Sequence, residues 1–77
     1  MMDKQVEEVI RTTFNLDSQI IDENWTSENL PQWDSMGHLN LMMALEKKFN
    51  IKFEIEEMFQ IQSLKDASNI IESKLHP

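Results

Sequence analysis

Residues 35–49 read Ser-Met-Gly-His-Leu-Asn-Leu-Met-Met-Ala-Leu-Glu-Lys-Lys-Phe, and this segment decides the fold. Its apolar side chains recur at spacings of three and four, the period of an α-helix; they are Met36, Leu39, Met42, Met43, Leu45 and Phe49, with Leu41 and Ala44 widening the face. A helix that is apolar around so much of its circumference must be buried on several sides. The segment from Ser35 or Met36 to Phe49 is therefore predicted to be the central helix of a bundle, with Asn50 as its stop.

The segments before this helix predict one further helix and a long loop. Val6 and Ile10 lie four residues apart between Asp3 and Phe14, so one apolar stripe of a first helix can face a core. Residues 15–32 lose this period and are mostly polar, with scattered apolar anchors. Loops this long are unusual in compact domains and tend to be functional. The loop therefore counts against a plain helical hairpin.

The C-terminal segments predict a short helix and a last helix. Residues 51–55 are expected to be extended, and residues 56–59 to form one helical turn. Ser63 and Asp66 have the spacing of a capping box, which predicts a last helix from Leu64 to about Leu75. We therefore predict a single all-α domain over residues 1–77: a four-helix bundle of three main helices and one short helix, with the long loop between the first and second.

Composition narrows the classes of protein that fit. The 77 residues contain no cysteine, which excludes disulfides and a thiol nucleophile of the chain's own. The net charge of -7 repels nucleic acid and anionic membranes, and it fits either basic protein partners or a charge that only keeps a small domain soluble, so on its own it selects no function. No apolar run approaches the roughly 18 residues that a membrane span needs, and the N-terminal residues lack the features of a secretory signal. We expect a monomer in the cytoplasm.

The residues that indicate chemistry are Trp33, Asp34, Ser35 and Met36, where the loop enters the central helix. The free N–H groups and the positive dipole end at a helix start favour an anionic group there. A phosphodiester on Ser35 would be well placed. Asp34 or Ser35 could instead be an ordinary N-cap, and these residues alone do not decide between the two interpretations.

The whole pattern resembles acyl carrier proteins over nearly the full length of the chain. The resemblance rests on Asp34-Ser35-Met36, then Leu39, Met-Met-Ala-Leu-Glu at 42–46 leading into Phe49 and Ile51, and Ser-Leu-Lys-Asp-Ala at 63–67. The family usually has Asp-Ser-Leu, so Met36 is a conservative departure of similar volume.

The resemblance implies a function for the serine. Ser35 would be esterified by 4'-phosphopantetheine from coenzyme A, and the terminal thiol of this arm would carry acyl groups as thioesters. The chain would then be a carrier and not an enzyme. Its expected partners are a phosphopantetheinyl transferase and acyl-activating, acyl-transferring or condensing enzymes. Asp34 matches the acidic neighbour of the modified serine, with roles in capping and recognition.

One departure from the family pattern points to a specialised carrier. Fatty-acid carriers usually have an acidic exposed face on the central helix, whereas Gly37, His38 and Asn40 follow the serine here and Lys47 and Lys48 lie near the end. The usual acidic docking face is largely missing. We therefore expect a carrier for a dedicated biosynthetic pathway rather than for housekeeping fatty-acid synthesis.

Four residues are candidate partner contacts: Asp34, Met36, His38 and Glu57. We interpret His38 as an exposed helix residue on the face of Ser35, because histidines of this kind are often simply on the surface. Glu57 belongs to an acidic cluster that could frame a docking surface or simply be solvated. Trp33 either flanks the attached arm or packs on the loop.

Two other functions remain open at this stage. An aminoacyl or peptidyl carrier serving a stand-alone adenylating enzyme would use Ser35 in the same way, because nothing in the chain identifies the cargo. A cofactor-free helical interaction module would need Ser35 only as a cap. An enzyme fits least, since the sequence lacks cysteine and any metal-ligand or glycine-rich phosphate motif.

Overall fold

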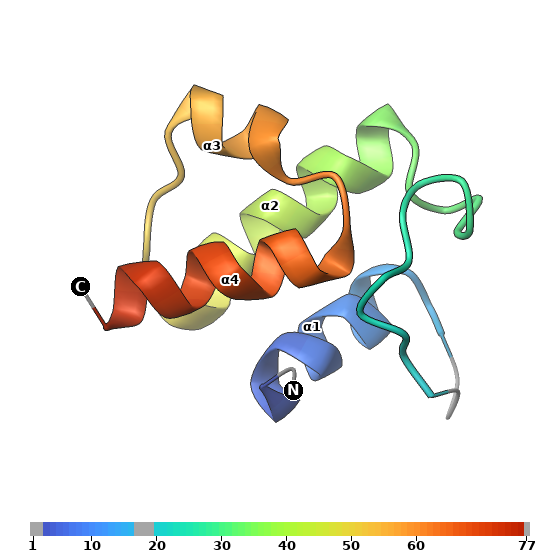
Figure 1. Cartoon of the computed structure of the whole chain (residues 1–77), viewed down its shortest axis with the longest axis horizontal. Helices are drawn as coiled ribbons and strands as arrows, with labels where there is room; N and C mark the ends of the chain where they lie inside the picture. The colour runs from blue at the N-terminus through green and yellow to red at the C-terminus, as the bar shows by residue number, and fades with distance from the viewer. Residues whose placement is uncertain (1–2, 17–19, 77) are drawn as a thin grey trace.

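The computed structural model describes residues 3–16 and 20–76. Within them the chain forms four α-helices and no named strand: α1 (Lys4–Thr13), α2 (Ser35–Phe49), α3 (Ile55–Gln60) and α4 (Leu64–Leu75). Figure 1 shows α2 at the centre, with α3 above it and α4 crossing in front of it. The predicted all-α arrangement is confirmed. The turn expected at 56–59 is a six-residue helix, one residue longer at each end.

Helix α2 is bounded at both ends by side chains and backbone that suit the termini of a helix. Asp34 has extended backbone angles, and its carboxylate accepts a hydrogen bond from the Gly37 N–H. At the other end Asn50 adopts the left-handed conformation, with φ 55° and ψ 51°, and donates its N–H to the Glu46 carbonyl. Asparagine tolerates this conformation better than most residues, so the predicted stop at Asn50 is confirmed.

The burial of α2 differs from the expectation. Leu41, Met42 and Leu45 are fully buried, but another stripe is exposed: Met36 at 66%, Leu39 at 45% and Met43 at 51%. These three residues are spaced by three and four, so they share one face of the helix. The expectation that α2 is buried on several sides is wrong for this face. The core covers one side of α2, and the short α3 leaves the other open to solvent.

Helices α3 and α4 both start with reciprocal hydrogen bonds between side chain and backbone. The Ser63 hydroxyl accepts from the Asp66 N–H at 3.1 Å, and the Asp66 carboxylate accepts from the Ser63 N–H at 3.2 Å. The capping box predicted for α4 is therefore confirmed. Glu54 and Glu57 form a similar pair at the start of α3, where the Glu54 N–H donates to the Glu57 carboxylate at 2.7 Å. Both pairs satisfy N–H groups that a helix start leaves unbonded.

The loop between α1 and α2 is joined to the start of α4 through main-chain hydrogen bonds. The Leu64 N–H donates to the Trp25 carbonyl at 3.0 Å, and the Lys65 N–H donates to the Glu23 carbonyl at 2.7 Å. Trp25 is half-buried and packs against the core, as expected of a loop anchor. Residues 17–19 of the predicted loop lie outside the described residues.

The last residues of the loop are anchored to α1 and to the core. The Gln32 side-chain amide donates to the Phe14 carbonyl at 3.1 Å. Leu30 and Trp33 are both buried, and the Trp33 ring lies 5.9 Å from the Phe14 ring, centroid to centroid. The approach to Ser35 is therefore held on both sides of Pro31.

The hydrophobic core draws on every helix but α3, with the flanking loops completing it. Its buried members are Val6, Val9, Ile10, Phe14, Leu16, Leu30, Trp33, Leu41, Met42, Leu45, Phe53, Ile61, Leu64, Ala67 and Ile71. Over the part of the chain that is described, none of the helices has the length and apolar character needed to cross a bilayer.

Candidate functional site

Ser35 is the first residue of α2, and its side chain is exposed. The N-cap is Asp34, whose carboxylate accepts the Gly37 N–H at 2.8 Å and whose carbonyl accepts the His38 N–H at 2.8 Å. The sequence allowed either Asp34 or Ser35 as the cap, and the geometry assigns this role to Asp34. The Ser35 hydroxyl is therefore not needed to cap the helix.

Gly37 is buried because the end of the loop passes directly beside the first turn of α2. A Cβ at this position would overlap the Gln32 carbonyl oxygen and would lie 3.1 Å from its carbonyl carbon. Only glycine permits this close approach. Gly37 is therefore a packing requirement, and its sequence-based grouping with the exposed residues that follow the serine is wrong.

His38 connects three segments of the chain. The Trp33 indole N–H donates to His38 Nδ1 at 2.9 Å, and His38 Nε2 lies 2.8 Å from the Met58 carbonyl oxygen. Because Nδ1 accepts a hydrogen bond, the neutral imidazole carries its proton on Nε2 and donates it to Met58. The rings of Trp33 and His38 are also stacked, with centroids 6.0 Å apart. The interpretation of His38 as an exposed histidine is wrong, since it is half-buried and bonded on both sides.

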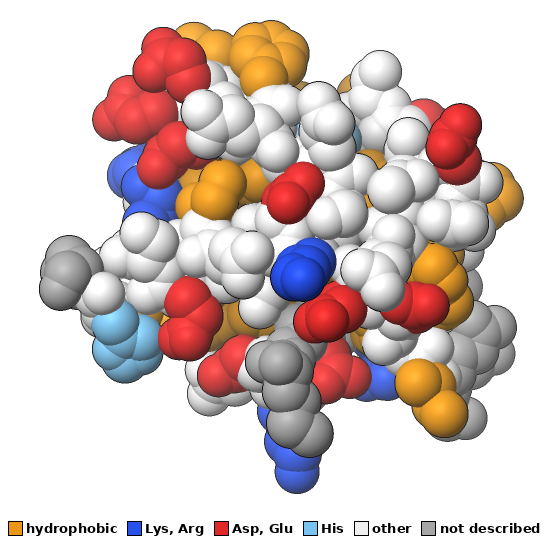
Figure 2. All heavy atoms as spheres, in the orientation of Figure 1, with side chains coloured by type: hydrophobic (Ala, Val, Ile, Leu, Met, Phe, Trp, Pro, Cys, Tyr) orange, Lys and Arg blue, Asp and Glu red, His pale blue; other side chains and the backbone are white. Residues whose placement is uncertain are grey.

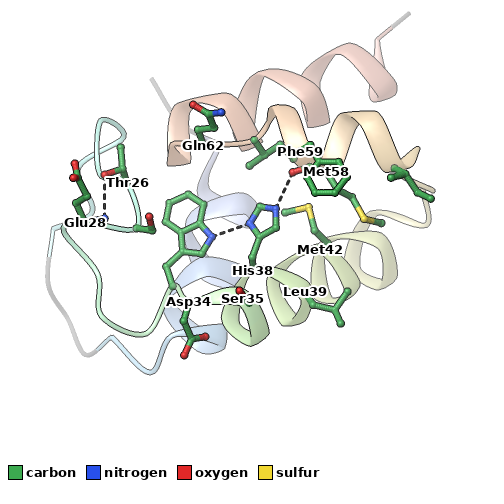
Figure 3. A pocket seen from close by; sticks show the side chains of 14 residues that line it. Thr26, Glu28, Asp34, Ser35, His38, Leu39, Met42, Met58, Phe59 and Gln62 are labelled. Atoms are coloured by element: carbon green, nitrogen blue, oxygen red, sulfur yellow. Dashed lines mark hydrogen bonds between the residues drawn. The ribbon is translucent and has the colours of Figure 1, made fainter.

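An open groove of about 950 Å³ begins at Ser35 and lies between the loop, α2 and α3. Its lining residues are Thr26, Ser27, Glu28, Trp33, Asp34, Ser35, His38, Leu39, Met42, Ile55, Met58, Phe59, Ile61 and Gln62. Figure 3 shows Thr26, Glu28 and Gln62 on one side of His38, and Leu39, Met42 and Met58 on the other. The serine thus stands at the mouth of a groove with a polar side and an apolar side.

The other predicted contacts occupy different places. Met36 is exposed next to Ser35 and does not line the groove. Glu57 faces α4, where its carboxylate lies 2.9 Å from the Lys74 ammonium. The hydrogen bond from Lys74, and after it the one from the Glu54 N–H, holds the pKa of Glu57 below its ordinary value. Glu57 therefore stabilises the fold, and its role as a partner contact stays a prediction.

Sequence reasoning missed the contacts of the groove that involve the backbone. The Met58 carbonyl that receives the His38 hydrogen bond is present in any residue, so no pattern could indicate it. The pairing of Trp33 with His38 spans five residues across the start of a helix, where helical spacing does not apply. A loop tryptophan close before a helix histidine is the only available signal.

A helical bundle with an exposed serine at the start of its central helix, beside an open groove, is the architecture of a carrier for a tethered group. The family model described as "Phosphopantetheine attachment site" matches residues 4–71. The chain belongs to this family. Its cofactor is a covalently attached 4'-phosphopantetheine, and as a member of the family it is a carrier and not a catalyst.

Individual relatives agree with this assignment. The acyl carrier protein of Petrotoga mobilis is 29% identical over 75 residues, covering 95% of this chain and 86% of that protein. The acyl carrier protein of Coprothermobacter proteolyticus is 26% identical over 73 residues, covering 95% and 89%. The solution structure of a holo acyl carrier protein from Geobacter metallireducens superposes with a TM-score of 0.82 at 25% identity, covering 95% of this chain and 87% of that one. The resemblance to acyl carrier proteins and the predicted fold are confirmed.

Proposed function

We propose that Ser35 is the attachment site of the phosphopantetheine arm, and that the chain carries acyl groups as thioesters on the thiol of this arm. The observation that carries the proposal is an exposed serine hydroxyl at the first position of α2 whose capping role is taken by Asp34. In the transfer, the Ser35 hydroxyl gives up its proton to the transferase or solvent and its oxygen forms a bond to the β-phosphorus of coenzyme A. The phosphoanhydride bond breaks, and adenosine 3',5'-bisphosphate leaves. The resulting phosphodiester anion would lie at the positive end of α2.

The environment of Ser35 suits this group. The arm needs an exposed start and a surface along which it can lie, and the groove supplies both polar and apolar walls. The chain has no cysteine, so the thiol of the arm is the sulfur available for a thioester. A tethered cargo is held at high effective concentration for each partner enzyme that docks.

Intact-mass measurement tests the site. The purified protein is incubated with coenzyme A and a promiscuous phosphopantetheinyl transferase, with a known carrier protein as the positive control. We expect the wild type to gain the mass of one phosphopantetheine and Ser35→Ala to gain none. A gain retained in Ser35→Ala would refute the site, and no gain in the wild type would favour the cofactor-free interaction module.

The exposed face of α2 supports a carrier for a specialised pathway. Met36, Asn40, Met43 and Lys47 are exposed at spacings of four, three and four, so they form one stripe that starts beside Ser35. None of them is acidic. The single carboxylate of the helix belongs to Glu46, which is half-buried and accepts a hydrogen bond from the Phe53 N–H at 2.8 Å.

Helix α3 adds exposed apolar side chains on the other side of the groove. Ile55 is 67% exposed and Phe59 is 76% exposed, and both line the groove with Leu39. The exposed apolar residues on the two helices are Met36, Leu39, Met43, Ile55 and Phe59. Figure 2 shows exposed hydrophobic side chains at the top of the molecule with acidic side chains to their left. Exposed apolar side chains on both helices beside the attachment serine favour a protein-docking site.

The absence of acidic groups on the exposed stripe of α2 favours one class of partner enzyme over another. Enzymes that recognise an acidic carrier helix with basic residues would find no carboxylate on the exposed stripe of α2, and Lys47 would repel them. A partner with an apolar docking face fits better. We therefore assign the chain to a dedicated pathway rather than to housekeeping fatty-acid synthesis.

A malonyl transferase of bacterial fatty-acid synthesis is a suitable probe of this assignment. We expect the phosphopantetheine-loaded wild type to accept malonyl groups with a kcat/KM at least about tenfold below that of a housekeeping carrier. The double variant Asn40→Glu/Lys47→Glu should recover much of this difference, and the matched control Asn40→Gln/Lys47→Gln should recover less. A wild type as efficient as the housekeeping carrier would refute the assignment.

A further inference from the structure

Trp33, His38 and the Met58 carbonyl form a continuous bridge from the loop through α2 to the C-terminal end of α3, which we call the His38 bridge. Its two hydrogen bonds measure 2.9 Å and 2.8 Å. All three residues also line the groove that begins at Ser35. Figure 3 shows the dashed bonds crossing the middle of this groove, with His38 reaching from α2 towards α3.

The bridge spans the gap between α2 and α3 three residues after the attachment serine. Met42 and Ile61 form the inner wall of the groove and are 0% and 3% exposed, whereas Leu39, Ile55 and Phe59 form its outer edge and are exposed. An alkyl chain tethered at Ser35 that moved from the outer edge to the inner wall would pass between α2 and α3. This gap is the one that the His38 side chain spans.

Opening the bridge has a definite chemical cost. Displacing His38 would leave the Trp33 indole N–H without its acceptor, although Trp33 is only 4% exposed. It would also remove the donor that His38 provides to the Met58 carbonyl. A buried polar group that loses its partner is destabilising, and this cost opposes the gain from burying an alkyl cargo. The intact bridge therefore disfavours entry of the cargo into the core.

The groove offers a different surface to cargo that stays outside the core. Thr26, Ser27, Glu28 and Gln62 line it with hydroxyl, carboxylate and amide groups. These groups can bond polar substituents but give no advantage to a bare alkyl chain.

We propose that the His38 bridge closes the route from Ser35 into the core, which makes His38 a specificity-determining residue of a carrier for short or polar acyl groups. This inference rests on the proposed attachment of the arm at Ser35. The cargo of the wild-type carrier remains in the groove and accessible to solvent. A longer alkyl cargo enters the core only when the bridge is absent.

Thioester accessibility tests the inference. A promiscuous transferase loads wild type, His38→Val and His38→Gln with acetyl- or octanoyl-phosphopantetheine from the corresponding acyl-coenzyme A, and intact mass confirms each product. Cleavage by hydroxylamine is then followed by mass. Glutamine is the conservative control, because its amide can accept from Trp33 and donate to Met58. Failure to load the wild type would count against the proposed attachment site and not against the bridge.

In the wild type and His38→Gln we expect the octanoyl and acetyl thioesters to be cleaved at similar rates. In His38→Val the octanoyl thioester should be cleaved about tenfold more slowly than the acetyl thioester, which corresponds to about 1.4 kcal/mol. Wild-type octanoyl cargo that is already protected, or an unchanged ratio in a folded His38→Val, would overturn the inference.

A second measurement needs only the wild type and therefore does not depend on the folding of a variant. The amide resonances of Met42 and Ile61 should shift little when the acetyl cargo is replaced by octanoyl. Large shifts at both residues would place the chain against the inner wall and refute closure by the bridge.

Discussion

Gly37→Ala tests how closely α2 is packed against the end of the loop. In an open helix the change would stabilise by about 1 kcal/mol, because alanine has the higher helix propensity. Here the new methyl group would overlap the Gln32 carbonyl oxygen, which belongs to the backbone and cannot rotate away. Overpacking of this kind costs about 1–3 kcal/mol.

The same substitution also disturbs the cap of α2. The new Cβ would lie 3.3 Å from Asp34 Oδ1, the atom that accepts the Gly37 N–H. An N-cap hydrogen bond is worth about 1 kcal/mol. With the propensity gain subtracted, we expect Gly37→Ala to lower the free energy of unfolding by about 1–3 kcal/mol, a large share of the few kcal/mol that a domain of this size holds.

Urea unfolding followed by tryptophan fluorescence measures this change, with the free energy obtained by linear extrapolation. Asn40→Ala is the matched control, because residue 40 is exposed on the same helix. The control should be as stable as the wild type or slightly more stable. If Gly37→Ala were also as stable as the wild type, the close approach of residue 32 to α2 would be refuted.

The cap of α2, the buried Met42 side chain and the Glu57–Lys74 pair each contribute measurably to stability. Asp34→Ala should lower the free energy of unfolding by about 1 kcal/mol in urea melts, since it removes the cap of α2. Met42→Ala should lower the free energy of unfolding by about 2–5 kcal/mol, because Met42 is fully buried. Leu39→Ala should lower it clearly less, because Leu39 is 45% exposed. Equal losses of stability in the two variants would contradict this difference in burial. Glu57→Gln should make the free energy of unfolding depend less on pH in the acid range. The pKa of Glu57 is lowered, first of all by Lys74, so the pairing gives stability that is present above the ordinary glutamate pKa. This stability is lost as the pH falls through the lowered pKa. In melts from neutral to acid pH, the free energy of unfolding should therefore decline less steeply in Glu57→Gln than in the wild type.

Hydrophobic period and capping chemistry predicted the main elements of the fold. The apolar spacing located α1, α2 and α4, and the Ser63–Asp66 pair located the start of α4. These signals are local, because each depends on residues within one or two turns. For the same reason the position of Ser35 at the start of α2 could be predicted.

The remaining features depend on which segments meet in space. Periodicity shows that Leu39 is apolar and helical, but not that α3 is too short to cover it. The pairing of Glu57 with Lys74 joins two residues that are seventeen positions apart in the sequence (74 − 57) and lie on different helices. The role of Gly37 depends on a backbone carbonyl of the loop. The sequence shows that such residues are polar or small. Only the tertiary structure shows which groups they contact.

The hydrogen bonds that join the loop to α4 bear on how the molecule opens locally. The N–H groups of Leu64 and Lys65 belong to the first turn of α4, where N–H groups usually face water, yet both are bonded to loop carbonyls. Separating the loop from α4 would therefore expose these amides and the loop in one event, and their hydrogens should exchange with solvent at a common rate. Helix α3 has no buried residue, and it is joined to α2 by the His38–Met58 hydrogen bond and to α4 by the Glu57–Lys74 pair. The segment that leads to Ser35 thus belongs to the same cooperative unit as the C-terminal helix.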